Sequence, residues 1–344
     1  DIPTMGRQNW FDAVGDEHRH VREKVGIFDQ SSFAKYEVSG PDALAALSHI
    51  CANDVTKPVG RLTYTQLLNT RGGIEADLTV ARLADDRFYI VTGTGFRTHD
   101  LAWIREHIAE GADVRIEDIT EAHGTLSLMG PHARDVLEKI TSADVSNAAF
   151  PFGHVREIDI AGHTVRALRV TYVGELGWEL HMPIGATGEI FDALMDAGKP
   201  WDIRPVGYRA LESLRLEKGY RAWGSDITPN DTPHEAGLGW AVRRNSNQPL
   251  TKRFAGFVID DPDAVLVGRE TILRNGQPVG YLTSGGYGYT IGKSVGYGYV
   301  RNQDGVSDDF LEDGDYELVI AMERFSARIG LKPFIDPANA RVKA

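Results

Sequence analysis

Residues 64–80 (YTQLLNTRGGIEADLTV) constrain the fold more strongly than any other stretch of this chain. Two strand-like runs flank residues 69–73, whose glycines can adopt the positive φ that a short hairpin loop requires. We therefore predict an antiparallel β-hairpin. In its second strand one face carries Ile74, Ala76, Leu78 and Val80, and the other carries Glu75, Asp77 and Thr79. The polar face is either an ordinary solvent-facing surface or the wall of a cleft that holds the Asp77 carboxylate, and the hairpin alone leaves both open.

The remaining patterns predict an α+β chain rather than a βαβ array. A short helix from residue 18, a turn at 29–32, a strand at 33–40 and a helix from 41 precede the hairpin. A third strand, ending at residue 92, and a helix at 96–111 follow it. A second hairpin is expected between 165–173 and 178–183, joined by 174–177. The clearest helix has Pro205 in its first turn and ends at Gly219.

After about residue 250 the pattern changes to short strands separated by glycines, without a convincing helix. This pattern predicts a separate C-terminal β-barrel or β-sandwich. A chain of 344 residues also exceeds the size of a usual single core, so two or three domains are expected.

Composition excludes several classes of function. The net charge of −12, with no concentrated basic stripe, argues against a nucleic-acid partner. No segment approaches the roughly 20 apolar residues of a membrane helix. The single cysteine, Cys51, rules out an internal disulfide and suits a buried apolar position in a reducing, cytoplasmic compartment. The first residues carry neither an initiating Met nor a signal pattern, so we expect a processed chain or a piece of a longer one.

Three apparent ligand motifs fail on their context. Residues 285–294 (GGYGYTIGKS) lack the first glycine of a phosphate-binding loop and lie between strands with no following helix. Residues 92–96 (TGTGF) lack the third glycine of a dinucleotide fingerprint. The eleven histidines form no HExxH motif, and we predict no metal site.

Polar and aromatic residues remain at strand ends and turns, a combination that suits a flat, hydrogen-bonding heterocycle better than a phosphate. Glu175 lies in a Gly-Glu-x-Gly turn, where exposure and burial are equally compatible with the sequence. Arg215 and Arg221 are equally compatible with interdomain ion pairs. The set consists of Asp77, Tyr89, Glu175, Arg215, Arg221, Trp223, Asp226 and Trp240.

Several motifs together resemble the folate-binding aminomethyltransferase family, which includes the glycine cleavage T-protein and the C-terminal halves of sarcosine and dimethylglycine dehydrogenases. They are LLNTRGGIEADLTV, TYVGELGWELHMP, ALESLRLEKGYRAWGSDITPNDTPHEAGLGW and the closing DPANARVKA. The resemblance covers nearly the whole chain in order. EKGYRAWGSD and RNGQPVGYLTSGGYGYTIGKSVGYGYV are most similar to the dehydrogenase branch, and residues 9–40 resemble the junction between its flavin and folate domains.

The resemblance implies a three-lobed α+β fold around a channel for tetrahydrofolate. Residues 1–245 would form the folate-binding region, from two intertwined lobes, and residues 246–344 a C-terminal β-barrel. Asp77 corresponds to the family's catalytic carboxylate, which would act as an anion and for that role needs no large pKa shift. The implied cofactor-binding residues are Tyr64, Tyr89, Val91, Tyr172, Glu175, Arg215 and Trp240.

One position departs from the T-protein pattern. The T-protein has an arginine that contacts the folate tail where this chain has Leu211. Arg209 lies two residues earlier, on a different face of the predicted helix, and cannot replace it. The departure favours the dehydrogenase branch and leaves the tail contact unassigned.

The implied activity is transfer of a one-carbon unit from a small-molecule donor to tetrahydrofolate, forming 5,10-methylenetetrahydrofolate in glycine, sarcosine or dimethylglycine metabolism. The chain has no flavin motif, so oxidation of the donor is expected in a flavin dehydrogenase domain or subunit. The compartment would be cytoplasmic, or the mitochondrial matrix in a eukaryote. Two alternatives remain: a methyltransferase that demethylates an O- or S-methyl donor, and a non-catalytic folate-binding protein. Relatives of the latter kind carry a Cys-containing KGC-type motif, which is absent around Cys51.

Overall fold

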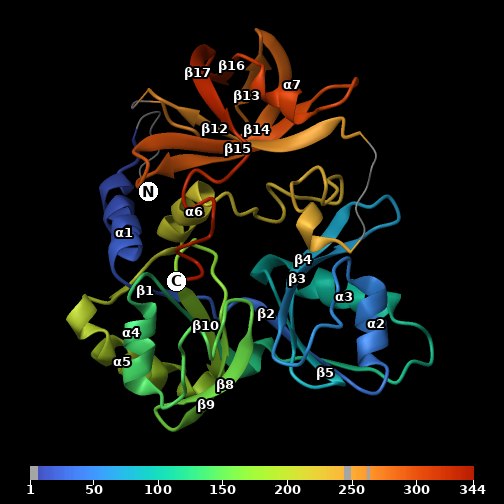
Figure 1. The fold of residues 1–344 in the computed structure, drawn as a ribbon, viewed down its shortest axis with the longest axis vertical. Helices are drawn as coiled ribbons and strands as arrows, with labels where there is room; N and C mark the ends of the chain where they lie inside the picture. The colour runs from blue at the N-terminus through green and yellow to red at the C-terminus, as the bar shows by residue number, and fades with distance from the viewer. Residues whose placement is uncertain (1–6, 244–248, 262–263) are drawn as a thin grey trace.

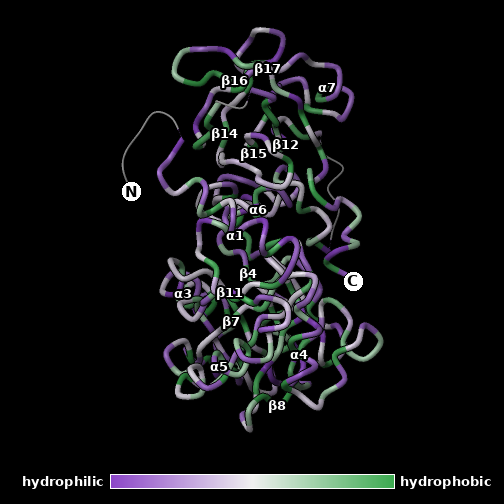
Figure 2. Tube along the Cα trace, turned by 90° about the vertical axis from the view of Figure 1, so that its left-hand side faces the viewer, coloured by the Kyte–Doolittle hydropathy of each residue, from purple (hydrophilic) through white to green (hydrophobic). Residues whose placement is uncertain are grey.

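The computed structural model describes residues 7–243, 249–261 and 264–344. Three lobes are arranged in a ring (Figure 1), which we call the six-strand lobe, the five-strand lobe and the barrel. α1 (Phe11–Glu23) and α6 (Tyr208–Glu217) lie between the barrel and the other two lobes in both views (Figures 1 and 2). The predicted α+β fold with a C-terminal barrel is confirmed. The predicted domain boundary at 245/246 lies outside the described residues.

The six-strand lobe is a mixed sheet covered by two helices. Ala133, Val136 and Leu137 follow helical spacing and are buried against the sheet. The strands in spatial order are β11 (Arg204–Pro205), β1 (Gly26–Asp29), β7 (His123–Met129), β10 (Gly177–Pro183), β9 (His163–Leu168) and β8 (Val155–Ile160), and the helices are α4 (Ala133–Ile140) and α5 (Thr187–Ala197).

The five-strand lobe contains the hairpin of residues 64–80. β3 and β4 pair antiparallel, with Gln66 opposite Asp77, and Gly72 adopts a φ of 80° in the loop, so the hairpin prediction is confirmed. The apolar face of β4 packs on two helices. The strands in spatial order are β3 (Leu62–Leu68), β4 (Ile74–Arg82), β5 (Arg87–Thr92), β2 (Ala34–Ser39) and β6 (Arg115–Asp118), with helices α2 (Ala43–Ile50) and α3 (Arg97–His107).

The barrel is closed, because β17 pairs with β12 as well as with β16. Its strands in spatial order are β12 (Lys252–Ile259), β15 (Lys293–Arg301), β14 (Gln277–Gly288), β13 (Thr271–Arg274), β16 (Tyr316–Ile320) and β17 (Glu323–Gly330). The sequence did not predict α7 (Asp308–Glu312), which is too short to show helical periodicity. The side chain of Ser307 caps it by accepting a hydrogen bond from the backbone N–H of Phe310 at 3.0 Å.

Pro205 was wrongly placed in the first turn of a helix. It lies in β11, whose residues pair in parallel with β1 at the edge of the six-strand sheet. An edge strand tolerates a proline because one side of its backbone needs no partner. α6 begins later, after Gly207, and Gly219 (φ 67°) ends it as predicted. The strand β1 was also missed, because its four residues continue an apparently helical run.

The predicted hairpin between 165–173 and 178–183 forms with a longer loop. β9 ends at Leu168, and residues 169–176 leave the sheet before β10 begins. The hydroxyl of Thr171 accepts hydrogen bonds from the backbone N–H groups of Val173 and Gly174, each at 3.2 Å, and so turns the loop. This loop carries Glu175 away from the sheet toward α1 and α6.

Candidate functional site

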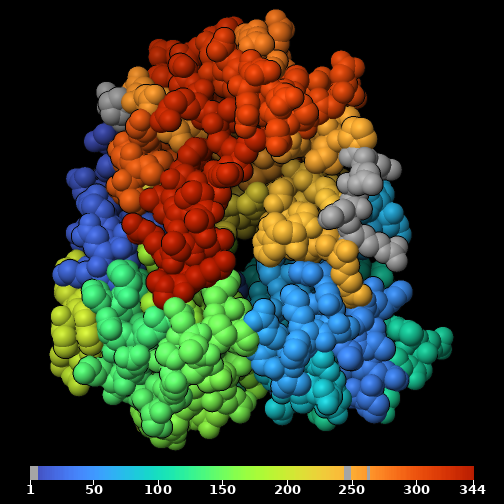
Figure 3. Space-filling view, viewed as in Figure 1, coloured from blue at the N-terminus to red at the C-terminus, as the bar shows by residue number. Residues whose placement is uncertain are grey.

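The molecular surface is hollowed where the three lobes meet. Figure 3 shows this hollow between the red C-terminal segment, the gold segment that follows α6, and the green and blue sheet lobes. β3 and β4 reach this region from the five-strand lobe (Figure 1). The side chains at its border therefore come from segments that are far apart in the sequence.

Strand register places four of the predicted residues on one face of the five-strand sheet. Tyr64 lies opposite Thr79, which lies opposite Val91, so their side chains share a face. Asp77 and Tyr89 belong to the same face by alternation. This is the face without helices, because the opposite face of β4 is buried against α2 and α3.

Asp77 is held in place by its neighbours in the sheet. Its Oδ1 accepts a hydrogen bond from Nε2 of Gln66 at 2.8 Å. Burial raises the pKa of Asp77 to about 6, while hydrogen bonds from Tyr64 and Gln66 oppose the rise and the charge of Asp100 adds to it. A pKa of about 6 still leaves Asp77 mostly ionised at neutral pH.

An aromatic pair, of which Trp240 is the exposed member, lies next to this carboxylate. The ring of Tyr64 stacks on Trp240, which belongs to the 3₁₀ turn Gly239–Ala241, with centroids 5.4 Å apart and an interplanar angle of 26°. Trp240 is 69% exposed, although an apolar ring of this size is normally covered. The pair offers a flat apolar surface beside an anion.

Tyr89 and Val91 are buried where the two sheet lobes meet. The hydroxyl of Tyr89 bonds to Nδ1 of His181 at 2.9 Å, and the guanidinium of Arg166 lies 4.4 Å from its ring centroid. Val91 packs in the same apolar cluster, together with Leu168 of the other lobe. Tyr89 therefore joins the lobes in this structure, and a direct contact of either residue with a cofactor stays a prediction.

Tyr172 lies in the loop between β9 and β10 and is half-buried. Its hydroxyl donates to the backbone oxygen of Arg221 at 3.0 Å, and its ring stacks on Tyr220 with centroids 5.9 Å apart. Burial raises the pKa of Tyr172, and the nearby charge of Asp77 raises it further. The structure thus brings Tyr172 and Asp77 within electrostatic reach of each other.

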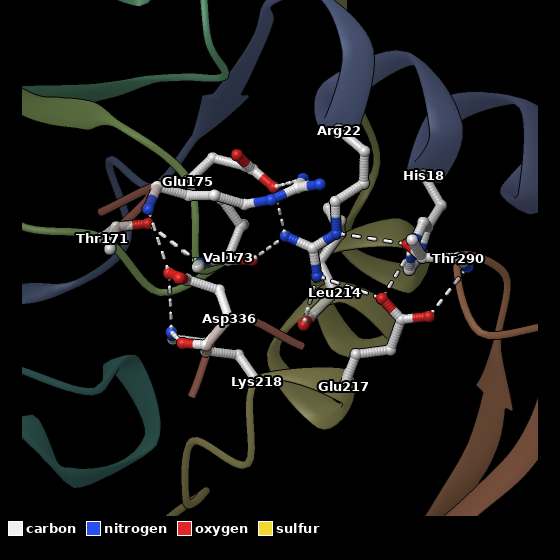
Figure 4. A network of polar contacts seen from close by, with 12 residues as sticks. His18, Arg22, Thr171, Val173, Glu175, Leu214, Glu217, Lys218, Thr290 and Asp336 are labelled. Carbon is white, nitrogen blue, oxygen red and sulfur yellow. Dashed lines mark hydrogen bonds and ion pairs between the residues drawn. The ribbon is translucent and has the colours of Figure 1, made fainter. Parts of the chain in front are cut away.

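Glu175 turns inward rather than toward solvent. It is 2% exposed, and its Oε1 accepts hydrogen bonds from Arg22 at 2.9 Å and from Arg341 at 2.8 Å. The preceding Gly174 has a φ of 81°, and a Cβ there would lie 2.8 Å from the side chain of Lys218. The turn therefore needs glycine both for its backbone and for close packing. Figure 4 shows Glu175 at the edge of the polar network that surrounds Arg22.

Arg215 is buried in a network of polar contacts within the protein. It is 4% exposed, and its donors are engaged by Glu212, the backbone oxygen of Tyr220, Asp226 and Ser284. Four hydrogen bonds and a further ion-pair contact of Nη2 with Glu212 thus surround the guanidinium. Arg215 therefore connects α6 to the barrel as a buried ion pair, and its contact with a cofactor stays a prediction.

The position that departs from the T-protein pattern is apolar and buried. Leu211 is 2% exposed and belongs to the apolar cluster between α1 and α6. Arg209 points elsewhere, with its guanidinium 4.4 Å from the ring centroid of Trp10. Leu211 offers no polar group for a folate tail, and the residue that contacts the tail stays unassigned.

Sequence reasoning missed Arg22 and Arg341 altogether. Both hold Glu175, yet they lie 153 and 166 residues from it along the chain. No local pattern marks either one. Arg221 was noted from the sequence but not assigned, and its charge acts on Asp77 and on Tyr64.

Two ligand motifs considered from the sequence can be compared with the described part of the chain. Within the described ranges, no group of three or more His, Cys, Asp or Glu side chains could hold a metal ion. Residues 285–294 form the end of β14, a turn and the start of β15, and no helix follows them. In the part of the chain that the structure covers, no helix is long and apolar enough to cross a bilayer.

The chain matches the family model of the GCVT N-terminal domain over residues 3–246 and that of the glycine cleavage T-protein C-terminal barrel domain over residues 252–336. It is 38% identical over 354 residues to 4-methylaminobutanoate oxidase (formaldehyde-forming) of Paenarthrobacter nicotinovorans, covering 99% of this chain and 42% of that protein. It is 36% identical over 376 residues to mitochondrial sarcosine dehydrogenase of Mus musculus, covering 96% and 41%. The chain thus spans about two fifths of the length of these curated relatives. The crystal structure of glycine cleavage system aminomethyltransferase T from Bartonella henselae has a TM-score of 0.83 at 28% identity, covering 94% of this chain and 90% of that one.

Proposed function

The chain belongs to the glycine cleavage T-protein family, and from this membership we propose that it transfers a one-carbon unit from a small-molecule amine donor to tetrahydrofolate, forming 5,10-methylenetetrahydrofolate. The observation that carries the proposal is the Asp77 carboxylate, fixed on a sheet face beside the stacked Tyr64 and the exposed Trp240. Family membership alone supports a one-carbon transferase; the product and the donor are our proposal.

The chemistry of the donor set fits a reduced pterin cofactor. A flat heterocycle can stack on the exposed Trp240 ring, which otherwise leaves apolar surface in water. Ring and amine N–H groups need hydrogen-bond acceptors, and the Asp77 and Glu175 carboxylates are strong ones. Among the described residues none donates a hydrogen bond to Oε2 of Glu175, so this oxygen is available to a ligand. We propose Tyr64, Tyr172, Glu175 and Trp240 as the binding residues, with Val91 in the wall behind them.

Tetrahydrofolate supplies the nucleophilic nitrogens that accept the one-carbon unit. Asp77 takes the proton that such a nitrogen releases, because its raised pKa makes it a stronger base than an ordinary carboxylate while it stays ionised near pH 7. Its negative charge also stabilises the positive charge that develops during transfer. Gln66 holds the carboxylate in one orientation, so little reorganisation is needed.

The donor is proposed to be an activated formaldehyde equivalent, such as the product of oxidising an N-methylated amine. The names of the two relatives, an oxidase described as formaldehyde-forming and a sarcosine dehydrogenase, support this class of donor. We propose that a flavin dehydrogenase domain or subunit carries out the oxidation, since this chain has no flavin motif.

The test supplies the protein with tetrahydrofolate and a sarcosine-derived iminium generated by a flavin dehydrogenase, and analyses the folate product by mass spectrometry. We expect 5,10-methylenetetrahydrofolate to form faster than in the uncatalysed reaction. A 5-methyl product would instead indicate a methyltransferase, and binding without turnover a folate-binding protein. Either result would contradict the proposal.

Two variants separate chemistry from binding. Asp77→Ala should lower the transfer rate about 100- to 10,000-fold while tetrahydrofolate still binds. Glu175→Ala should instead weaken tetrahydrofolate affinity in titration calorimetry. Unchanged turnover of Asp77→Ala would refute the role assigned to that carboxylate.

A further inference from the structure

Arg22 is the centre of a buried polar network that joins three parts of the fold. It comes from α1, is 6% exposed, and reaches between the loop before β10 and the end of α6 (Figure 4). One end of its guanidinium meets that loop, and the other end meets α6. Its acceptors are the backbone oxygen of Val173 (2.6 Å) and Oε1 of Glu175 (2.9 Å) for Nη1, the backbone oxygen of Leu214 (3.1 Å) and Oε2 of Glu217 (3.2 Å) for Nη2, and Oγ1 of Thr290 (3.3 Å) for Nε.

The two carboxylates that Arg22 contacts are in different situations. Glu217 is fully buried, and His18 and Arg22 help to lower its pKa to about 2 against the effect of burial. Its two oxygens are both used, since Oε1 accepts from the backbone N–H groups of Thr290 and Ile291. Glu217 is thus a structural anion with its hydrogen bonds complete.

Glu175, in contrast, is held through one oxygen only. Arg22 and Arg341 both donate to Oε1, and no described residue donates to Oε2. Oε2 is not completely enclosed by the protein and keeps some contact with solvent. A carboxylate fixed in this way presents its second oxygen to a ligand in one orientation.

We propose that Arg22 is a positioning residue for the cofactor site, fixing Oε1 of Glu175 so that Oε2 is set to accept a hydrogen bond from the bound folate. This inference rests on the function proposed above. The anchoring of Arg22 makes the orientation rigid, because its other four N–H groups are bound to Val173, Leu214, Glu217 and Thr290. Arg341, whose side chain is 45% exposed, adds a second and less constrained bond.

The test is a double-variant cycle on the full chain, with tetrahydrofolate as the probe in titration calorimetry. Arg22→Gln and Glu175→Gln should each weaken binding about 10- to 100-fold, the range expected for hydrogen bonds to charged groups. The affinity of the double variant for tetrahydrofolate should be at most about threefold lower than that of the single variant with the lower affinity, because both substitutions remove the same interaction. In turnover assays Arg22→Gln should raise the KM for tetrahydrofolate and change kcat much less.

Two further variants control for structure. Arg19→Gln changes an exposed arginine of the same helix and should bind tetrahydrofolate like the wild type. Arg22→Lys keeps the positive charge, so this variant should fold. A lysine cannot donate hydrogen bonds to both ends of the network, so the variant should bind tetrahydrofolate several-fold more weakly than the wild type. If Arg22→Gln does not fold, Arg22→Lys replaces it in the double-variant cycle with Glu175→Gln.

The outcomes separate this inference from the proposed function. If the wild type does not bind tetrahydrofolate, the proposed function fails and the inference fails with it. If the wild type binds and Glu175→Gln weakens binding, the proposed site stands. The inference is then overturned when a folded Arg22 variant binds within about twofold of the wild type, or when the single effects multiply in the double variant.

Discussion

Replacing the Asp77 carboxylate by its neutral isostere should stabilise the protein while it removes the transfer activity. Burial raises the pKa of Asp77 from 3.8 to about 6, which means that ionising this group costs more in the folded than in the unfolded chain. A difference of about 2 pH units corresponds to about 3 kcal/mol at neutral pH. Asp77→Asn avoids this cost and keeps an acceptor for Nε2 of Gln66. The figure is an upper limit, because an amide also needs a partner for its own N–H groups.

The gain should depend on pH in one direction only. Above about pH 6 the wild-type carboxylate is ionised in both states, and the full cost of its raised pKa opposes folding. As the pH falls through 6 toward 4, the folded wild type takes up a proton before the unfolded chain does, so its stability recovers. The difference between Asp77→Asn and the wild type should therefore be largest near pH 8 and small near pH 4.

The assay is thermal unfolding of both proteins across this pH range, without folate. For 344 residues, an unfolding entropy of about 2 cal/mol/K per residue converts 3 kcal/mol into about 4 °C if the chain unfolds as one unit. Asp77→Ala serves as a comparison, because it removes the charge but also the acceptor for Gln66. If Asp77→Asn melts at the same temperature as the wild type at pH 8, or at a lower one, the argument that burial of the ionised carboxylate destabilises the folded protein is refuted.

Three further outcomes follow from the packing. Trp240→Ala should weaken tetrahydrofolate binding roughly 2- to 10-fold in calorimetry, with little change in melting temperature because the ring is 69% exposed; unaltered affinity would remove Trp240 from the site. Gly73→Ala should lower stability by about 1–3 kcal/mol, since its Cβ would lie 2.0 Å from the backbone oxygen of Pro229, whereas Gly95→Ala, with nothing within 4 Å, should unfold more nearly like the wild type. Burial raises the pKa of the Cys51 thiol to about 12, so iodoacetamide should label it at pH 8 only after denaturation, and rapid labelling of the native protein would contradict its burial.

Local patterns predicted the elements whose structure depends on neighbouring residues. The alternation in β4 and the loop glycines were enough to place Asp77 on a strand face opposite an apolar one. Pro205 was misplaced because its partner, β1, lies nearly 180 residues earlier, and only that pairing makes it part of a strand. Sequence spacing contains no information on such a contact.

The candidate site could be predicted only in part for the same reason. Glu175 was equally compatible with exposure and burial until Arg22 and Arg341 were found beside it. For Arg215 the sequence left an interdomain ion pair and a ligand contact equally open, and the structure adds its contacts with Glu212, Tyr220, Asp226 and Ser284. Whether a charged side chain binds a ligand or another residue depends on which distant segments meet it.

The closed barrel and the two open sheets protect the protein from self-association in different ways. Because β17 pairs with β12, the barrel has no row of unpaired N–H and C=O groups on which a strand of another molecule could add. Each open sheet has two edge strands, β11 and β8 in one and β3 and β6 in the other. Two of these edges carry several charged side chains, β6 with the sequence RIED and β8 with VREIDI. Neutralising those edge charges should therefore lead to aggregation through the sheet lobes, whereas comparable changes on the barrel surface should leave the protein monodisperse.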